Sequence, residues 1–182
     1  MKHLILLVDA SGSMVSHEQE TRDAICSIIK GLDKSNHLTL VFFDTGEYKI
    51  VANKFVSSIN SNIGQIFEAD GGTPITDSIY KAIQDVSNGV DDLRRLSEEH
   101  RIIIFTDGEE NSSHYVENED LGRAIEHFTE NFHWDFQFVG PKTQGAGIKA
   151  YAESIKIKGE NICLYTDVSE GLAMMKDAAL KK

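Results

Sequence analysis

Small side chains that carry oxygen atoms follow a short apolar run near the start of the chain. Asp9, Ser11 and Ser13 occupy alternate positions directly after residues 3–8. One carboxylate and two hydroxyls at this spacing can converge on one small, hard cation, and Mg²⁺ prefers oxygen ligands in near-octahedral geometry. Ser, Gly and Asp are also common in ordinary turns. On this stretch alone, a turn without a metal is an equal alternative.

Two later stretches carry similar groups. One is Gly71-Gly72-Thr73-Pro74, and the other is Thr106-Asp107, which follows the apolar residues 102–105. In open α/β sheets the carboxyl ends of the parallel strands share one edge, and ligands bind there. We therefore expect five residues to converge at that edge: Asp9, Ser11, Ser13, Thr73 and Asp107.

The elements that must position these residues alternate between strands and helices. Residues with strand composition lie at 3–8, 37–43, 48–51, 101–105, 133–139 and 161–165. Apolar residues recur at helical spacing over 16–32, from 74 to 88, over 118–132 and 144–155, and again after 167. This alternation predicts an α/β fold with a mostly parallel sheet and helices on both faces. Residues 48–51 follow a tight turn and should form an antiparallel edge strand.

Several helix boundaries follow from local signals. Ser16 and Gln19 fit a capping box, and Thr73 is placed to cap a helix that begins at Pro74. Asp167 should cap the last helix, with Glu170 at its third position. Residues 55–70 are expected to form a loop with one short helix, and residues 90–99 to extend the preceding helix.

Composition excludes some classes of function. At 182 residues, 41% hydrophobic and 26% charged, the chain is expected to form one domain over residues 1–182. A net charge of −11 argues against nucleic acid as the partner. The first apolar run is too short for a signal peptide or a membrane span. Cys26 and Cys163 lack disulfide or metal spacing. We therefore expect a soluble, cytoplasmic protein.

Taken together, Val8 to Met14, Gly71 to Pro74 and Phe105 to Glu109 resemble the von Willebrand factor A domain family. The resemblance covers essentially the whole chain. It implies a doubly wound, Rossmann-like sheet of six strands in the order 3-2-1-4-5-6, with the third strand antiparallel. It also implies the family's metal ion-dependent adhesion site, whose pattern is Asp-x-Ser-x-Ser, then a Thr, then an Asp.

The same resemblance implies a role for each matching residue. Ser11, Ser13 and, with a ligand engaged, Thr73 would bind Mg²⁺ directly, and Mn²⁺ is an alternative ion. Asp9 and Asp107 would act mainly through waters and hydrogen bonds. All five positions are filled, so the site is complete. Two neighbours, Gly72 and Glu109, are expected to face the partner. Glu109 and Glu110 either rim the site and repel acidic partners or are simply solvated.

The expected function is metal-dependent protein binding rather than catalysis. Hydroxyl ligands are neutral, so the metal keeps positive charge and can accept a Glu or Asp carboxylate from a partner. The resemblance is to intracellular members from bacteria and their viruses, which work beside separately encoded partners that include chaperone-type ATPases.

Two alternatives stay open. One is a set of caps and turns without metal. The other is a metal-dependent hydrolase or phosphatase that uses the same acidic edge. However, phosphatases with an Asp nucleophile carry a second Asp two residues on, where this chain has Ser11, and no Gly-rich phosphate loop is present.

Overall fold

A computed structural model describes residues 2–89, 99–142 and 147–181. Its strands form one sheet in the order β3-β2-β1-β4-β5-β6. All neighbouring strands run parallel except β2 and β3, which are antiparallel. The predicted order and the antiparallel third strand are therefore confirmed. The strands are β1 (Lys2–Asp9), β2 (His37–Phe43), β3 (Tyr48–Phe55), β4 (Glu99–Phe105), β5 (Asp135–Pro141) and β6 (Ile162–Tyr165).

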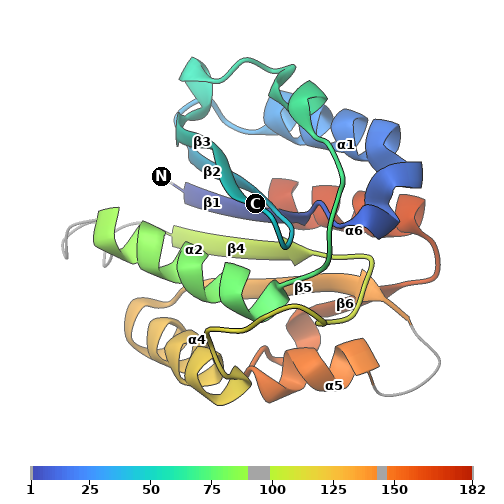
Figure 1. The fold of residues 1–182 in the computed structure, drawn as a ribbon. Coiled ribbons are helices and arrows are strands. Elements are labelled where there is room, and N and C mark those ends of the chain that lie inside the picture. Colours follow the sequence, from blue (N-terminus) through green and yellow to red (C-terminus); the bar gives the residue numbers. More distant parts are fainter. Residues whose placement is uncertain (1, 90–98, 143–146, 182) are drawn as a thin grey trace.

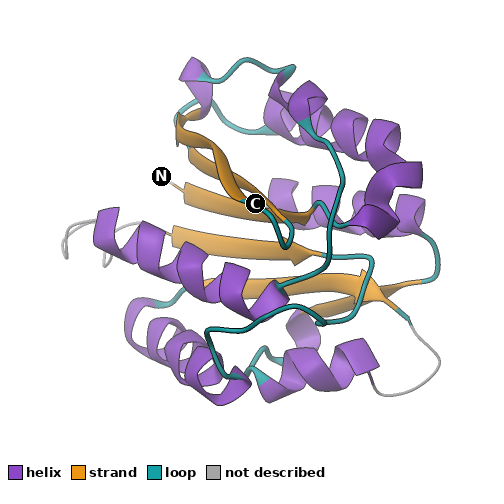
Figure 2. Cartoon of the chain, in the orientation of Figure 1, coloured by secondary structure: helices purple, strands orange, loops and turns teal. Residues whose placement is uncertain are grey.

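Helices cover both faces of the sheet (Figures 1 and 2). On one face lie α1 (Glu18–Gly31) and α6 (Val168–Leu180). On the other lie α2 (Ile75–Gly89), α4 (Asn118–Phe132) and α5 (Gly147–Ser154). The helix predicted over residues 90–99 falls almost wholly outside the described residues. Every helix in the described ranges is too short or too polar to cross a bilayer.

The central strand β1 explains why its sequence is a continuous apolar run. Leu4, Leu6 and Val8 pack into the core beneath α1 and α6, while Ile5 and Leu7 pack into the core beneath α2. A strand covered on both faces has no solvent-facing side, so it does not alternate between apolar and polar residues. Its last residue, Asp9, is consequently a carboxylate at the end of a fully buried strand.

The predicted capping box at Ser16 and Gln19 is wrong. The turn after β1 continues as a 3-10 helix over Gly12–His17, and α1 begins only at Glu18. Ser16 therefore lies inside the 3-10 helix rather than at the start of α1. The residue that precedes α1, His17, makes no side-chain capping hydrogen bond.

The predicted cap at Thr73 is also wrong. The N–H of Thr76, which a Thr73 cap would take, donates instead to Glu110 Oε2 at 2.7 Å. The next N–H, of Asp77, donates to Ser113 Oγ at 3.0 Å. The loop after β4 therefore caps α2, which leaves the Thr73 hydroxyl free of that role. In contrast, Asp167 caps α6 as predicted, by accepting the N–H of Glu170.

Other boundaries differ by a few residues. Residues 48–51 are the first part of a longer strand that runs to Phe55. The segment expected to form a loop with one short helix contains two 3-10 helices, Val56–Ser58 and Ile63–Ile66. Another 3-10 helix, Gly159–Asn161, precedes β6.

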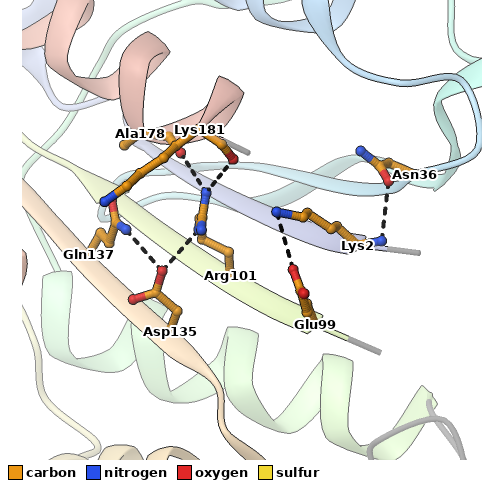
Figure 3. Close-up of polar contacts among 8 residues, drawn as sticks. All are labelled: Lys2, Asn36, Glu99, Arg101, Asp135, Gln137, Ala178 and Lys181. Carbon is orange, nitrogen blue, oxygen red and sulfur yellow. Dashed lines mark hydrogen bonds and ion pairs between the residues drawn. The ribbon is translucent and has the colours of Figure 1, made fainter. Parts of the chain in front are cut away.

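Arg101 of β4 anchors the end of α6 at the edge of the sheet opposite Asp9 (Figure 3). Its Nε donates to Asp135 Oδ2 at 2.9 Å, and its Nη1 donates to the backbone carbonyls of Ala178 and Lys181, each at 3.0 Å. The last carbonyls of a helix have no partner within the helix. The guanidinium therefore satisfies one of them, together with the carbonyl of the residue that follows α6, and ties the helix to the sheet.

Candidate metal site

Loops from three parts of the chain meet at the carboxyl edge of the sheet. The N–H of Gly12, after β1, donates to the carbonyl of Gly71 at 2.9 Å. The N–H of Thr73 donates to Asn111 Oδ1 at 3.0 Å, which joins the loop before α2 to the loop after β4. These bonds fix the three sequence motifs relative to one another before any side chain of the site is considered.

Gly71 is required by its backbone conformation. Its φ is +73°, in the left-handed region that side chains disfavour. A Cβ on this residue would lie only 2.6 Å from Thr45 Oγ1. The glycine therefore allows the loop before α2 to turn back toward β1 and bring Thr73 to the site.

Asp9 is a fully buried carboxylate that accepts two hydrogen bonds. Its Oδ1 accepts the N–H of Ser11 at 2.8 Å, and its Oδ2 accepts the hydroxyl of Thr106 at 2.6 Å. Burial raises the pKa of Asp9 to about 6, although these hydrogen bonds act in the opposite direction. No ion pair among the described residues includes Asp9. Buried charges are normally paired or bound to metals, so a cation at this position would compensate the burial.

The remaining oxygens form a chain that starts next to Asp9. Ser11 Oγ lies 3.1 Å from Ser13 Oγ, which in turn donates to Asp107 Oδ1 at 2.7 Å. Burial also raises the pKa of Asp107, and the Ser13 hydroxyl opposes that shift. Thr73 is buried, and a Cβ on Gly108 would lie 3.4 Å from its hydroxyl. The structure therefore brings all five predicted residues to one edge.

The donor set is one of hydroxyls and carboxylates. Over the residues described, no group of three or more His, Cys, Asp or Glu side chains could hold a metal ion. A cation here would therefore depend on the hydroxyls of Ser11, Ser13 and Thr73. Such neutral and acidic oxygens suit a hard ion such as Mg²⁺.

Gly72 and Glu109, the residues expected to face the partner, differ in their surroundings. Gly72 is half-buried, and its N–H donates to Thr45 Oγ1 at 2.9 Å. A Cβ there would lie 2.5 Å from Ser112 Oγ, so Gly72 is packed between neighbouring loops. Glu109 is exposed beside Asp107. Glu109 therefore lies open to a partner, whereas Gly72 helps to shape the loop.

Glu110 is not merely a solvated side chain, so that expectation for it is wrong. It is half-buried, and in addition to the N–H of Thr76 its carboxylate accepts the backbone N–H groups of Ser112 and Ser113. Its function is to fold the loop after β4 onto the start of α2.

The sequence did not reveal the supporting roles of three residues. Thr106 holds Asp9, and Asn111 holds the backbone of Thr73. The hydroxyl of Tyr165 donates to the carbonyl of Thr106 at 2.8 Å, so the end of β6 also supports the site. Thr106 could have been suspected because it precedes Asp107 in the motif. Nothing in the local sequence of Tyr165 indicates its partner.

With this geometry described, comparison with known proteins identifies the family. The sequence profile of the von Willebrand factor type A domain matches residues 3–140, which include all three loops. The chain belongs to the von Willebrand factor type A (VWA) domain family. No curated protein sequence matches it significantly.

Solved structures share the VWA fold at low sequence identity. Von Willebrand factor type A from Catenulispora acidiphila has a TM-score of 0.69 at 16% identity, over 99% of this chain and 42% of that chain. Proximal thread matrix protein 1 from the mussel byssus, with a zinc-occupied MIDAS (metal ion-dependent adhesion site) motif, has a TM-score of 0.71 at 15% identity, over 98% of this chain and 45% of that chain. The vWF domain of the pilus tip protein Mfa5 from Porphyromonas gingivalis has a TM-score of 0.68 at 9% identity, over 96% of this chain and 93% of that chain. The VWA chain described here spans less than half the length of the first two.

Proposed function

We propose that this VWA domain binds one divalent cation, Mg²⁺ or alternatively Mn²⁺, and through it a Glu or Asp carboxylate of a protein partner. The observation that carries the proposal is Asp9, a buried carboxylate without an ionic partner among the described residues, next to a chain of hydroxyls that ends at Asp107. In this proposal Ser11, Ser13 and Thr73 ligate the ion, and Asp9 and Asp107 hold the ligands and bound waters in place.

The type of ligand supports a role in binding. Neutral hydroxyl ligands leave most of the ion's charge available for an incoming carboxylate. The zinc-occupied MIDAS motif of the mussel protein supports the capacity of this fold to hold a metal there. A cytoplasmic location is part of the proposal and comes from the composition of the chain. An origin in bacteria or their viruses, and a separately encoded partner such as an ATPase, are also part of the proposal and come from the family resemblance alone.

Calorimetric titration with Mg²⁺ and Mn²⁺ tests the metal site. We expect the wild type to bind one ion, and the isosteric variant Asp9→Asn to lose binding because the anionic centre is removed. The variant should remain folded by circular dichroism, because it replaces a carboxylate that burial disfavours. Unchanged Mg²⁺ affinity in Asp9→Asn would refute the assignment. Phosphoester turnover that requires the ion would favour the hydrolase alternative.

Thr73→Ala tests how the ion is used. The partner is first captured in Mg²⁺ and released by EDTA, and then its binding isotherm is measured. We expect Thr73→Ala to weaken partner binding more than Mg²⁺ binding, and the control Thr73→Ser to restore it. Because Glu110 and Ser113 cap α2, the helix does not depend on the Thr73 hydroxyl. Partner binding that persists in EDTA would show that another surface is used.

A further inference from the structure

A pocket of about 410 Å³ lies beside the proposed metal site. It is formed by the turn between β2 and β3, the first turns of α2 and the loop after β4, and its walls include Tyr48, Pro74 and Tyr115. Its walls combine the apolar surfaces of these residues with charged side chains. This volume falls within the range of ligand pockets in proteins and is ample for one aromatic side chain.

The pocket adjoins the loop that carries Thr73. Thr45 lines the pocket and accepts the N–H of Gly72, the neighbour of Thr73. Pro74, on the opposite side of Thr73 in the sequence, forms part of the pocket wall. A protein segment that places a carboxylate at the metal can therefore reach the pocket with a nearby residue.

One wall of the pocket is an exposed tyrosine on a fixed backbone. The carboxylate of Asp77, in the first turn of α2, accepts the N–H groups of His114, Tyr115 and Val116 at 2.8, 3.2 and 2.9 Å. The Tyr115 side chain is nevertheless 91% exposed. A rigid aromatic residue loses little conformational entropy on binding, and such residues are enriched at the centres of interfaces.

Charges near the pocket restrict what can enter. Asp44, Glu47 and Asp77 contribute three carboxylates to the lining, and Glu47 is exposed and lies 3.9 Å from Lys49 in an ion pair. Lys81 Nζ lies 4.4 Å from the centroid of the Tyr48 ring. A second acidic residue in the partner would face Asp44 and Glu47 at close range, whereas an aromatic ring would meet the rings of Tyr48 and Tyr115. Like charges placed together across an interface disfavour the wrong partner.

We propose that this pocket takes an aromatic side chain that lies within a few residues of the metal-binding acid in the partner segment, with basic rather than acidic neighbours. The proposal rests on the proposed function and adds the sequence preference of the partner. The pocket would supply specificity, and the metal would supply the obligatory carboxylate contact.

Binding of free indole tests the pocket without the metal. In EDTA, ¹⁵N–¹H spectra of the full chain are recorded during titration with indole. We expect shifts centred on the amides of Thr45, Ser78 and Tyr115, and an indole affinity that falls about threefold to tenfold in Tyr115→Ala, as expected for the loss of one aromatic pair. Phe55→Ala is the control, because Phe55 is an exposed aromatic residue outside this pocket. Shifts that are absent, or centred elsewhere, would overturn the proposal.

An array of short synthetic peptides tests the link to the metal. Each peptide has a central Glu, and Trp, Ala, Lys or Asp is placed in turn at each flanking position. In Mg²⁺ we expect strongest retention with Trp at one or two flanking positions. At the other flanking positions, Lys should give stronger retention than Ala, and Asp weaker retention. Tyr115→Ala should remove the Trp preference but keep the requirement for Glu and Mg²⁺.

The outcomes separate the two proposals. Retention that needs Glu and Mg²⁺ but shows no preference for Trp would overturn the aromatic pocket and leave the proposed function intact. If no peptide is retained in a Mg²⁺-dependent manner while indole still binds, the metal-bridged function fails, and the pocket as an extension of it fails too.

Discussion

Thr106 holds the buried carboxylate of Asp9 from the neighbouring strand, through a hydrogen bond of 2.6 Å. Residues that orient metal ligands typically change metal affinity 10–100-fold when they are replaced. We therefore predict that Thr106→Val, which keeps the shape but removes the hydroxyl, weakens Mg²⁺ binding by about tenfold in a calorimetric titration. Thr106→Ser, which keeps the hydroxyl, is the control and should bind within about twofold of the wild type. Equal affinities in all three proteins would show that this hydrogen bond does not orient Asp9.

At the scale of residues, the sequence was sufficient to predict which site residues lie together when they belong to one local motif. Asp9, Ser11 and Ser13 share one turn, so their proximity follows from spacing alone. The contact of Thr106 with Asp9 depends on β1 and β4 being neighbours, and the contact of Tyr165 with Thr106 depends on the position of β6. Such contacts between distant segments cannot be inferred from spacing within one segment.

Among the elements, α6 is held to the sheet by Arg101. The contribution of this contact can be compared with that of a more exposed ion pair nearby. Arg101 satisfies two carbonyls at the end of α6 and pairs with Asp135, with the two side chains 18% and 32% exposed. We predict that Arg101→Met lowers the free energy of unfolding by about 1–3 kcal/mol, because charge-assisted hydrogen bonds to partly buried groups are lost. Hydrogen exchange in the last turn of α6 should accelerate.

The control lies in the same region (Figure 3). Lys2 and Glu99 form an ion pair of 3.2 Å with side chains 35% and 74% exposed. Glu99→Gln should change the unfolding free energy by about 0.5 kcal/mol or less, since exposed pairs contribute little. Urea unfolding of both variants makes the comparison. Equal small effects would mean that Arg101 does not anchor α6.

Element types were predictable, but helix starts were less so. Apolar runs placed the central strands within a few residues, because these strands are buried on both faces of the sheet. The start of α1 was misplaced because a 3-10 helix follows the Ser11-to-Ser13 turn. The cap of α2 was misassigned because Glu110 comes from another loop. Local capping signals indicate which residues can cap, but tertiary contacts determine which residue does so.

For the whole molecule, a row of histidines at the amino edge of the sheet makes stability depend on pH. His3 lies between His37 and His100 on neighbouring strands, with ring centroids 4.5 and 5.3 Å away, and hydrogen-bonds to the hydroxyl of Thr39. Burial, together with the charges of His37 and His100, lowers the pKa of His3 from 6.5 to about 3. Below pH 6.5, His3 is therefore protonated in the unfolded chain but stays neutral in the folded chain until the pH approaches 3.

We predict that His3 alone removes about 2 kcal/mol of stability between pH 7 and pH 5. The stability that comes from keeping His3 neutral is fully present above pH 6.5 and is lost as the pH falls toward 3. Urea unfolding of wild type and His3→Leu across this range provides the measurement, and the variant should show the shallower pH dependence. The comparison is needed because the raised pKa of Asp9 has the opposite sign, favouring the folded state as the pH falls toward 4. Parallel curves would exclude His3 as the cause.

The central place of β1 has a consequence for synthesis in the cell. β1 is made before its partner β4, which begins only at Glu99. At typical rates of about 5–20 residues per second, one edge of this strongly apolar strand stays unpaired for several seconds while the rest of the chain emerges. Apolar strands with free edges are templates for aggregation. We therefore expect the nascent chain to be most prone to aggregation in the period before β4 is made.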